Sequence, residues 1–220
     1  DNAGRRKTSN DSTIGTSGYT LPFYKIGITG EAAGVDYTWA LNTGSPGAWA
    51  VGSAGVGGRV TDGTVAATDG GALPYVNAAS GTNYLVGFSG SSSVANRMAL
   101  YDVLWVNDAL VVTTTTEQLL TSVAFPARDL TGTVNGKGCQ VGILVTTATG
   151  QGGAITNCTL NYTNSAGTAT RTATMASFPA TATAGTIVWF QLEAGDVGIK
   201  SIQGITLGTT MTSGAISLIV

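Results

Sequence analysis

The chain has 220 residues, of which 43% are hydrophobic and only 10% are charged, and its formal net charge is −2. It contains no histidine and only two cysteines, so the commonest general base and metal ligand is missing, and we expect no enzyme, no metal and no cofactor. Without a basic stripe or an apolar run of about 20 residues, we also expect neither nucleic acid nor a membrane as a partner.

Residues 1–18 are polar and contain one basic cluster, Arg5-Arg6-Lys7. Ile14 is the only large apolar residue among them, so the segment cannot order itself by burying apolar surface of its own. We interpret it as an extended N-terminal arm whose three basic side chains contact a neighbouring subunit. A solvated tail is the alternative, because chain termini are commonly disordered.

The sequence of residues 19–83 predicts that the packed domain begins with a loop-rich region, because it contains turn signals such as Asp62-Gly63. Trp39 and Trp49 lie in this region. Because an indole combines a large apolar surface with a polar N–H, we expect both side chains to anchor loops or to contact a partner subunit. If they are exposed, they could instead stack on a glycan.

Strand patterns strengthen from residue 84, and residues 84–220 are expected to provide the core strands. The 32 glycines and many threonines disfavour helices, because Gly costs backbone entropy and Thr loses rotamer freedom in a helix. In the first part of this region the expected strands are 84–88, 98–106, 109–114 and 119–125, and the last of these stops at Pro126.

The second part of the region is typical of hairpins. Cys139, Val141, Ile143 and Val145 alternate with Gln140, Gly142, Leu144 and Thr146, apolar residues alternate with polar ones over 158–162, and Asn164-Ser165-Ala166-Gly167 suits a tight reversal. Further strands are expected at 168–174, 187–192, 199–207 and 215–220. Strands of this length with a turn about every ten residues predict an all-β, jelly-roll-like antiparallel sandwich, with residues 19–220 in a single domain.

Eight segments of the sequence, in order between residues 23 and 220, are similar to those of a family of structural proteins from tailed-bacteriophage virions. They are YKIG (24–27), ALYDVLW (99–105), LVVTTTT (110–116), FPARD (125–129), NYTN (161–164), RTATM (171–175), LEAGDVG (192–198) and IQGITLG (202–208). Residues 58–79 fit the family least well. No catalytic residue comes with the resemblance.

The resemblance implies a structural protein of the virion, and the leading hypothesis is a capsid decoration (cement) protein on its outer surface, assembled in the bacterial cytoplasm. Its expected partners are the major capsid protein and other copies of the chain in a homo-oligomer, which could be a trimer. The surface with few charges fits close packing against neighbours. The alternative is a host-recognition appendage or fibre head that binds surface glycans through Trp39 and Trp49.

The charged and sulfur-bearing side chains have structural interpretations. Arg128 and Asp129 are expected to form a local ion pair in a loop, or to contact a partner subunit. Glu193 and Asp196 are expected to shape a turn, because a cation such as Ca²⁺ needs six or more oxygen ligands. In a reducing bacterial cytosol, two buried free thiols are favoured over a disulfide between Cys139 and Cys158.

Overall fold

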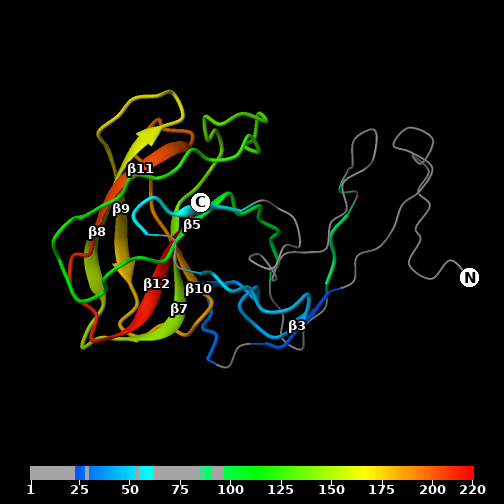
Figure 1. Ribbon diagram of the computed structural model, residues 1–220. Helices are drawn as coiled ribbons and strands as arrows, with labels where there is room; N and C mark the ends of the chain where they lie inside the picture. Colours follow the sequence, from blue (N-terminus) through cyan, green and yellow to red (C-terminus); the bar gives the residue numbers. More distant parts are fainter. Residues whose placement is uncertain (1–22, 28–29, 53–54, 62–84, 86, 91–96) are drawn as a thin grey trace, which may run out of the picture.

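The computed structural model describes residues 23–27, 30–52, 55–61, 85, 87–90 and 97–220, and its strands pack as an antiparallel sandwich (Figure 1). Among these residues there is no helix, and the predicted fold class is confirmed. The strands are β1 (Tyr24–Lys25), β2 (Asp36–Tyr37), β3 (Gly44–Ser45), β4 (Arg59–Val60), β5 (Trp105–Asn107), β6 (Gln118–Leu119), β7 (Gly142–Gly150), β8 (Ile155–Asn164), β9 (Arg171–Phe178), β10 (Thr186–Trp189), β11 (Ile199–Thr206) and β12 (Ser213–Ile219). The predicted arm, residues 1–18, lies outside the described residues.

Strands β5–β12 form a jelly roll. The strand order is β2-β10-β7-β12-β5-β4 in one sheet and β6-β11-β8-β9 in the other. The first of the eight strands pairs with the last, β5 with β12, and the pairing continues inward as β6 with β11, β7 with β10 and β8 with β9. This nested pairing is that of one long antiparallel ribbon wrapped around a core, as in double-sheet jelly rolls.

Strand β8 shows how the sequence pattern places side chains. Cys158, Leu160 and Tyr162 are at most 1% exposed and belong to the core, while the residues between them are half-buried. Ile155 is also buried, although it precedes Cys158 by three positions instead of two. Asn157 has a φ of 57°, and a left-handed residue changes which face of the strand the preceding side chains occupy.

The main core lies between the two sheets and receives large side chains from both. Trp105 is completely buried, its ring centroid lies 6.0 Å from that of Phe125, and its Nε1 donates a 3.0 Å hydrogen bond to the carbonyl of Gly57. The next residue, Gly58, has a φ of 63°, and a Cβ there would overlap the Trp105 indole. The loop that leads into β4 therefore needs glycine where it crosses this ring.

A second cluster covers the opposite face of the six-stranded sheet. Its buried members are Val51, Val106, Leu144, Ile187 and Ile219. The alternation predicted over 139–146 is present, because Ile143 and Val145 face the main core while Leu144 faces this second cluster. Leu41, Trp49 and Val51 of the loop-rich N-terminal region cover the part of the sheet around Leu144, which is therefore buried on both faces.

On both sides of the sandwich, backbone hydrogen bonds join one sheet to the other or to the segment beside it. On one side, Thr174 and Gln191 exchange backbone hydrogen bonds of 2.9 and 2.8 Å. On the other side, residues 120–123 bond to β11 and also to residues 56–57, next to β4. Exposed strand edges invite pairing with other chains, and these two seams cover much of the edges in the jelly roll.

Several predicted strands are shorter than expected or absent. Residues 109–114 form no strand, because the Asn107 side chain accepts the N–H of Ala109 in a turn and the Gln118 amide bonds both backbone groups of Val111. Within 98–106 only the last two residues belong to a strand, and the described residues of 84–88 belong to none. Local side-chain bonds compete with strand ladders wherever Asn and Thr are frequent.

Candidate interaction surface

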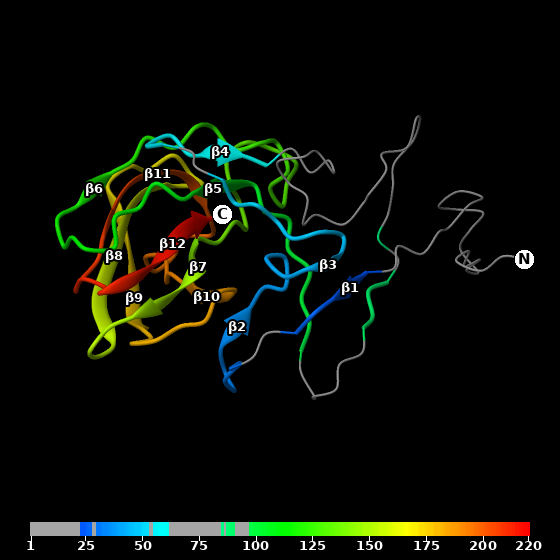
Figure 2. The same cartoon turned by 60° about the horizontal axis from the view of Figure 1, so that its bottom comes forward.

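Three short segments form an extension beside the jelly roll: residues 23–27, residues 42–47, and the described residues of 85–90. Its only ladder is the antiparallel pair β1–β3, in which Tyr24 lies opposite Ser45 and Lys25 opposite Gly44. Figures 1 and 2 both show this pair projecting away from the sandwich. Two strands of two residues cannot be stable by themselves, so other contacts must order the extension.

Lys25 orders the backbone of the extension. Its ammonium donates to the carbonyls of Ala40, Asn42 and Gly47 at 3.5, 3.1 and 2.8 Å. In return, the Asn42 amide donates a 2.6 Å hydrogen bond to the carbonyl of Ile26. All three ammonium protons are used, and partial burial lowers the pKa of Lys25. We call this arrangement the Lys25 clasp. The only sign of it in the sequence is that Lys25 is a single charged residue within an apolar run.

The extension exposes its apolar side chains. Tyr24, Ile26, Leu85 and Phe88 are 68, 53, 67 and 38% exposed, and Phe23 stacks on Phe88 with the ring centroids 5.9 Å apart. No described residue of the extension is buried. An ordered backbone that carries an uncovered apolar surface is typical of a site for another protein.

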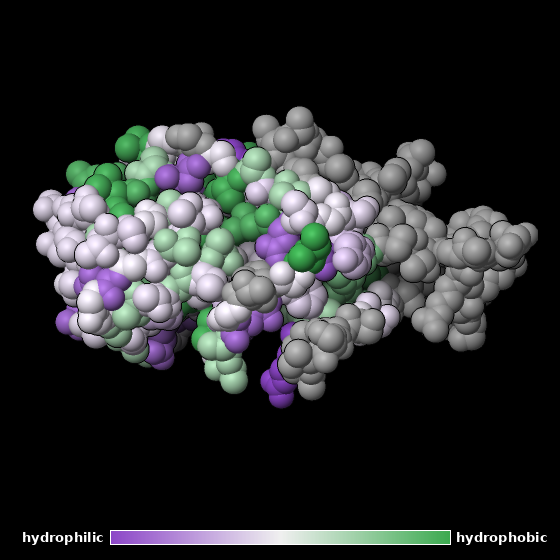
Figure 3. Space-filling model, turned by 90° about the horizontal axis from the view of Figure 1, so that it is seen from below, coloured by the Kyte–Doolittle hydropathy of each residue, from purple (hydrophilic) through white to green (hydrophobic). Residues whose placement is uncertain are grey.

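A second exposed apolar surface lies on the jelly roll around β6, and we call it the β6 stripe. Leu119 and Val123 are 73 and 43% exposed on one side of the segment that closes the sandwich, and Val56 beside them is 66% exposed. Val111, whose backbone is bonded by Gln118, is 52% exposed. Figure 3 shows strongly apolar surface gathering at the end of the molecule where Figure 2 places β6.

The two tryptophans expected to contact a partner are both half-buried. Trp49 packs against the second cluster over the six-stranded sheet, as a loop anchor would. The Trp39 indole donates a 3.2 Å hydrogen bond to the Glu31 carboxylate. Arg5, Arg6 and Lys7 lie outside the described residues. Partner contact by these five residues therefore stays a prediction.

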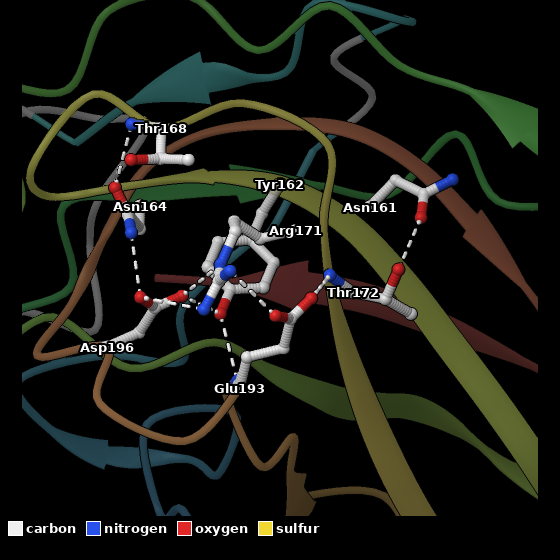
Figure 4. A network of polar contacts seen from close by, with 8 residues as sticks. All are labelled: Asn161, Tyr162, Asn164, Thr168, Arg171, Thr172, Glu193 and Asp196. Carbon is white, nitrogen blue, oxygen red and sulfur yellow. Dashed lines mark hydrogen bonds and ion pairs between the residues drawn. The ribbon is translucent and has the colours of Figure 1, made fainter.

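A polar latch joins the β8–β9 hairpin to the turn before β11 (Figure 4). Asp196 is at its centre, with its side chain 5% exposed. It accepts hydrogen bonds from Tyr162, from Asn164 at 2.7 Å and from the Arg171 Nε at 3.0 Å. Glu193 completes the latch through a 2.9 Å ion pair with Arg171 and accepts the N–H of Thr172 at 2.7 Å. The cation near these carboxylates is thus the guanidinium of Arg171.

The latch shifts the ionisation of its members. Burial opposes the charge on Asp196, but hydrogen bonds from Tyr162, Arg171 and Asn164 outweigh this and hold its pKa below the usual value. Burial, reinforced by the hydrogen bond to Asp196, raises the pKa of Tyr162 to about 12. Both shifts stabilise the protonation states that these hydrogen bonds need at neutral pH, a charged Asp196 and a neutral Tyr162.

A shallow groove of about 410 Å³ lies beside the latch, lined by Gly138, Cys139, Gln140, Phe190, Gln191, Leu192, Asp196 and Val197. Both cysteines are free thiols, as expected, but only Cys158 is buried as both were expected to be, and Cys139 is half-buried. Burial, with the charges of Asp129 and Asp102, raises the pKa of Cys139 to about 11. A thiol that stays protonated is a weak nucleophile, so the raised pKa does not favour nucleophilic attack by Cys139.

The predicted ion pair between Arg128 and Asp129 is wrong. Arg128 instead binds Asp102 through two bonds of 2.9 and 3.1 Å and donates to the carbonyl of Thr61 at 3.0 Å. Asp129 is buried and accepts the N–H groups of Thr133 and Lys137, among others. Burial opposes its charge, yet these bonds hold its pKa well below the usual range. The Asp129 carboxylate holds this loop closed by binding backbone N–H groups, and the positions of Arg128 and Asp129 in the sequence do not indicate this role.

Within the described part of the chain, no group of three or more His, Cys, Asp or Glu side chains could hold a metal ion. No described helix is long and apolar enough to cross a membrane. A scan against protein-family models finds no match, and searches of the curated proteins and of the solved structures return no similar protein.

Proposed function

We propose that the chain is a structural protein of a tailed-bacteriophage virion, a decoration protein that cements the outer surface of the capsid after assembly in the bacterial cytoplasm. The observation that carries the proposal is the extension, whose backbone is held by the Lys25 clasp while Tyr24 and Ile26 stay exposed. An element that is ordered before binding loses less conformational entropy on docking.

Two further features support the proposal. The eight segments that resemble phage virion proteins include YKIG, which forms β1 and carries the clasp. The fold is a double-sheet jelly roll, an architecture used by viral capsid proteins but also by lectins and cupins. The fold is therefore an analogy, and the exposed extension is the stronger argument.

The proposed mechanism is mechanical. The jelly roll, closed on both sides, serves as a rigid body, and the extension docks on the major capsid protein or on another copy. A protein that binds only the assembled shell stabilises that shell by mass action. Many copies bound to one shell make weak individual contacts sufficient.

The proposal is tested by the copy number of the chain in purified virions, measured by quantitative gel analysis. We expect many copies on the head for the wild type, and a strong reduction for Ile26→Ser. Leu130→Ser is the matched control, because Leu130 is 79% exposed outside the extension and the β6 stripe, and it should be incorporated normally. Absence of the wild-type chain from virions would overturn the proposal.

A small number of copies at the tail would favour the alternative, a host-recognition appendage. That alternative also expects glycan binding that Trp39→Ala removes. Trp49→Ala is less informative, because Trp49 packs on the second cluster and its loss would also loosen the loop region.

A further inference from the structure

Among the described residues, two groups of exposed apolar side chains lie on opposite sides of the sandwich. The extension carries Tyr24, Ile26, Leu85 and Phe88, and the β6 stripe carries Val56, Val111, Leu119 and Val123. In Figure 2 the pair β1–β3 and strand β6 lie on opposite sides of the sandwich, and Figure 1 also shows the extension leaving on one side. One molecule therefore cannot cover one of these surfaces with the other.

We propose that the extension of one copy docks on the β6 stripe of the next copy, in a head-to-tail contact. The inference rests on the proposed function and names the partner of the extension. A head-to-tail contact joins two different surfaces, and it closes into a ring when the rotation between copies allows. Such a ring is one form of the homo-oligomer expected of a cement protein.

The chemistry of the two surfaces matches. None of the eight side chains carries a charge. Three charged groups close to these side chains in sequence are engaged within the chain: the Lys25 ammonium is held by three carbonyls, the Glu117 carboxylate accepts the amide of Asn161, and Arg59 donates to the carbonyl of Val51. An apolar surface with its neighbouring charges engaged fits an apolar partner surface better than an acidic peptide or a phosphate.

The exposed apolar area reaches the lower limit for a specific interface. Taking roughly 100 to 200 Å² for a full side chain, the eight side chains expose on the order of 600 Å² in total. Apolar atoms make up about 57% of a typical interface. An interface built on these side chains would therefore bury on the order of 1,000 Å², the lower limit for a specific contact and the size of a weak one.

The test is sedimentation velocity on the full chain and on two variants, Ile26→Glu and Leu119→Glu. Because both positions are exposed, the variants should fold, which circular dichroism checks. We expect the wild type to form oligomers and each variant alone to be monomeric. An equal mixture should form dimers, because one variant keeps its β6 stripe and the other keeps its extension. Leu130→Glu is the control and should form oligomers like the wild type.

Three results would overturn the inference: a monomeric wild type, oligomers of the Leu119→Glu variant, or a mixture that stays monomeric. Measuring incorporation into virions as well as sedimentation shows whether the head-to-tail contact or the proposed function is wrong. A chain that is monomeric but enters virions, and loses this ability in Ile26→Glu, docks on a different shell protein. A chain that forms oligomers but is absent from virions overturns the proposed function alone.

Discussion

The jelly roll and the extension are ordered by different forces. Strands β7–β12 pack against a core whose members Ile143, Leu160 and Ile202 are fully buried. The extension buries no described side chain and depends on the Lys25 clasp. Apolar burial stabilises a whole domain cooperatively, whereas a few backbone hydrogen bonds hold only a local conformation. Mutations in the two regions should therefore change different measurements.

The largest loss of stability is expected from Trp105→Ala in the main core. Trp105 is completely buried, contacts Phe125 and bonds to the carbonyl of Gly57. Its removal leaves a cavity and should cost about 3–5 kcal/mol, measured by urea denaturation. Trp39→Ala is the matched control, because Trp39 is only half-buried. Equal losses in the two variants would contradict the division between core and covering region.

The next effect is expected from Asp196→Asn in the polar latch. The folded-state pKa of Asp196 is lowered, so its charge contributes stability that is fully present above the ordinary pKa of about 4 and is lost as the pH falls through the folded value. The variant should be less stable than the wild type at pH 7, and the difference should shrink in acid.

Asp102→Asn is the control for Asp196→Asn, because it also removes the carboxylate of an ion pair. Asp102 is 53% exposed in its pair with Arg128, and exposed pairs contribute little. Thermal denaturation across the acidic range compares the variants. A difference between Asp196→Asn and wild type that stays constant down to pH 2 would show that the charge of Asp196 is irrelevant to folding.

The strands of the core could be predicted from the sequence, but the ion pairs that join distant segments could not. The strands after residue 139 were predictable, because long runs alternate and Asn164 to Gly167 has turn composition. The second cluster was not predicted, although Val141 to Val145 is continuously apolar, the pattern of a sheet buried on both faces. The partners of Arg128 and Arg171 lie about 25 residues away in sequence, and no local pattern encodes such pairs.

The same latch predicts a smaller effect at alkaline pH. The pKa of Tyr162 is raised to about 12 in the folded protein, so its neutral form contributes stability that is present below about pH 10 and is lost as the pH rises toward 12. In Tyr162→Phe this part of the pH dependence should be absent. Stability curves of wild type and variant that fall in parallel above pH 10 would refute this role.

The smallest effect on global stability is expected from Lys25→Met. The variant removes the clasp but no core contact, so the melting temperature should change little. The backbone of residues 23–27 and 42–47 should become more sensitive to limited proteolysis, because three carbonyls lose their donor. Lys137→Met is the control, because no side-chain bond of Lys137 orders the extension. A large fall in melting temperature would show that the extension and the jelly roll fold as one unit.

The most direct test of the account is amide hydrogen exchange of the chain, free and bound to virion shells. We predict that binding slows exchange at Ile26 and at residues 42–47, and also around Leu119, where the neighbouring copy is proposed to dock. Exchange in the hairpin of β8 and β9 should not change. Slower exchange confined to β8 and β9, with the extension unaffected, would contradict the claim that the extension contacts the partner while the jelly roll serves as its rigid support.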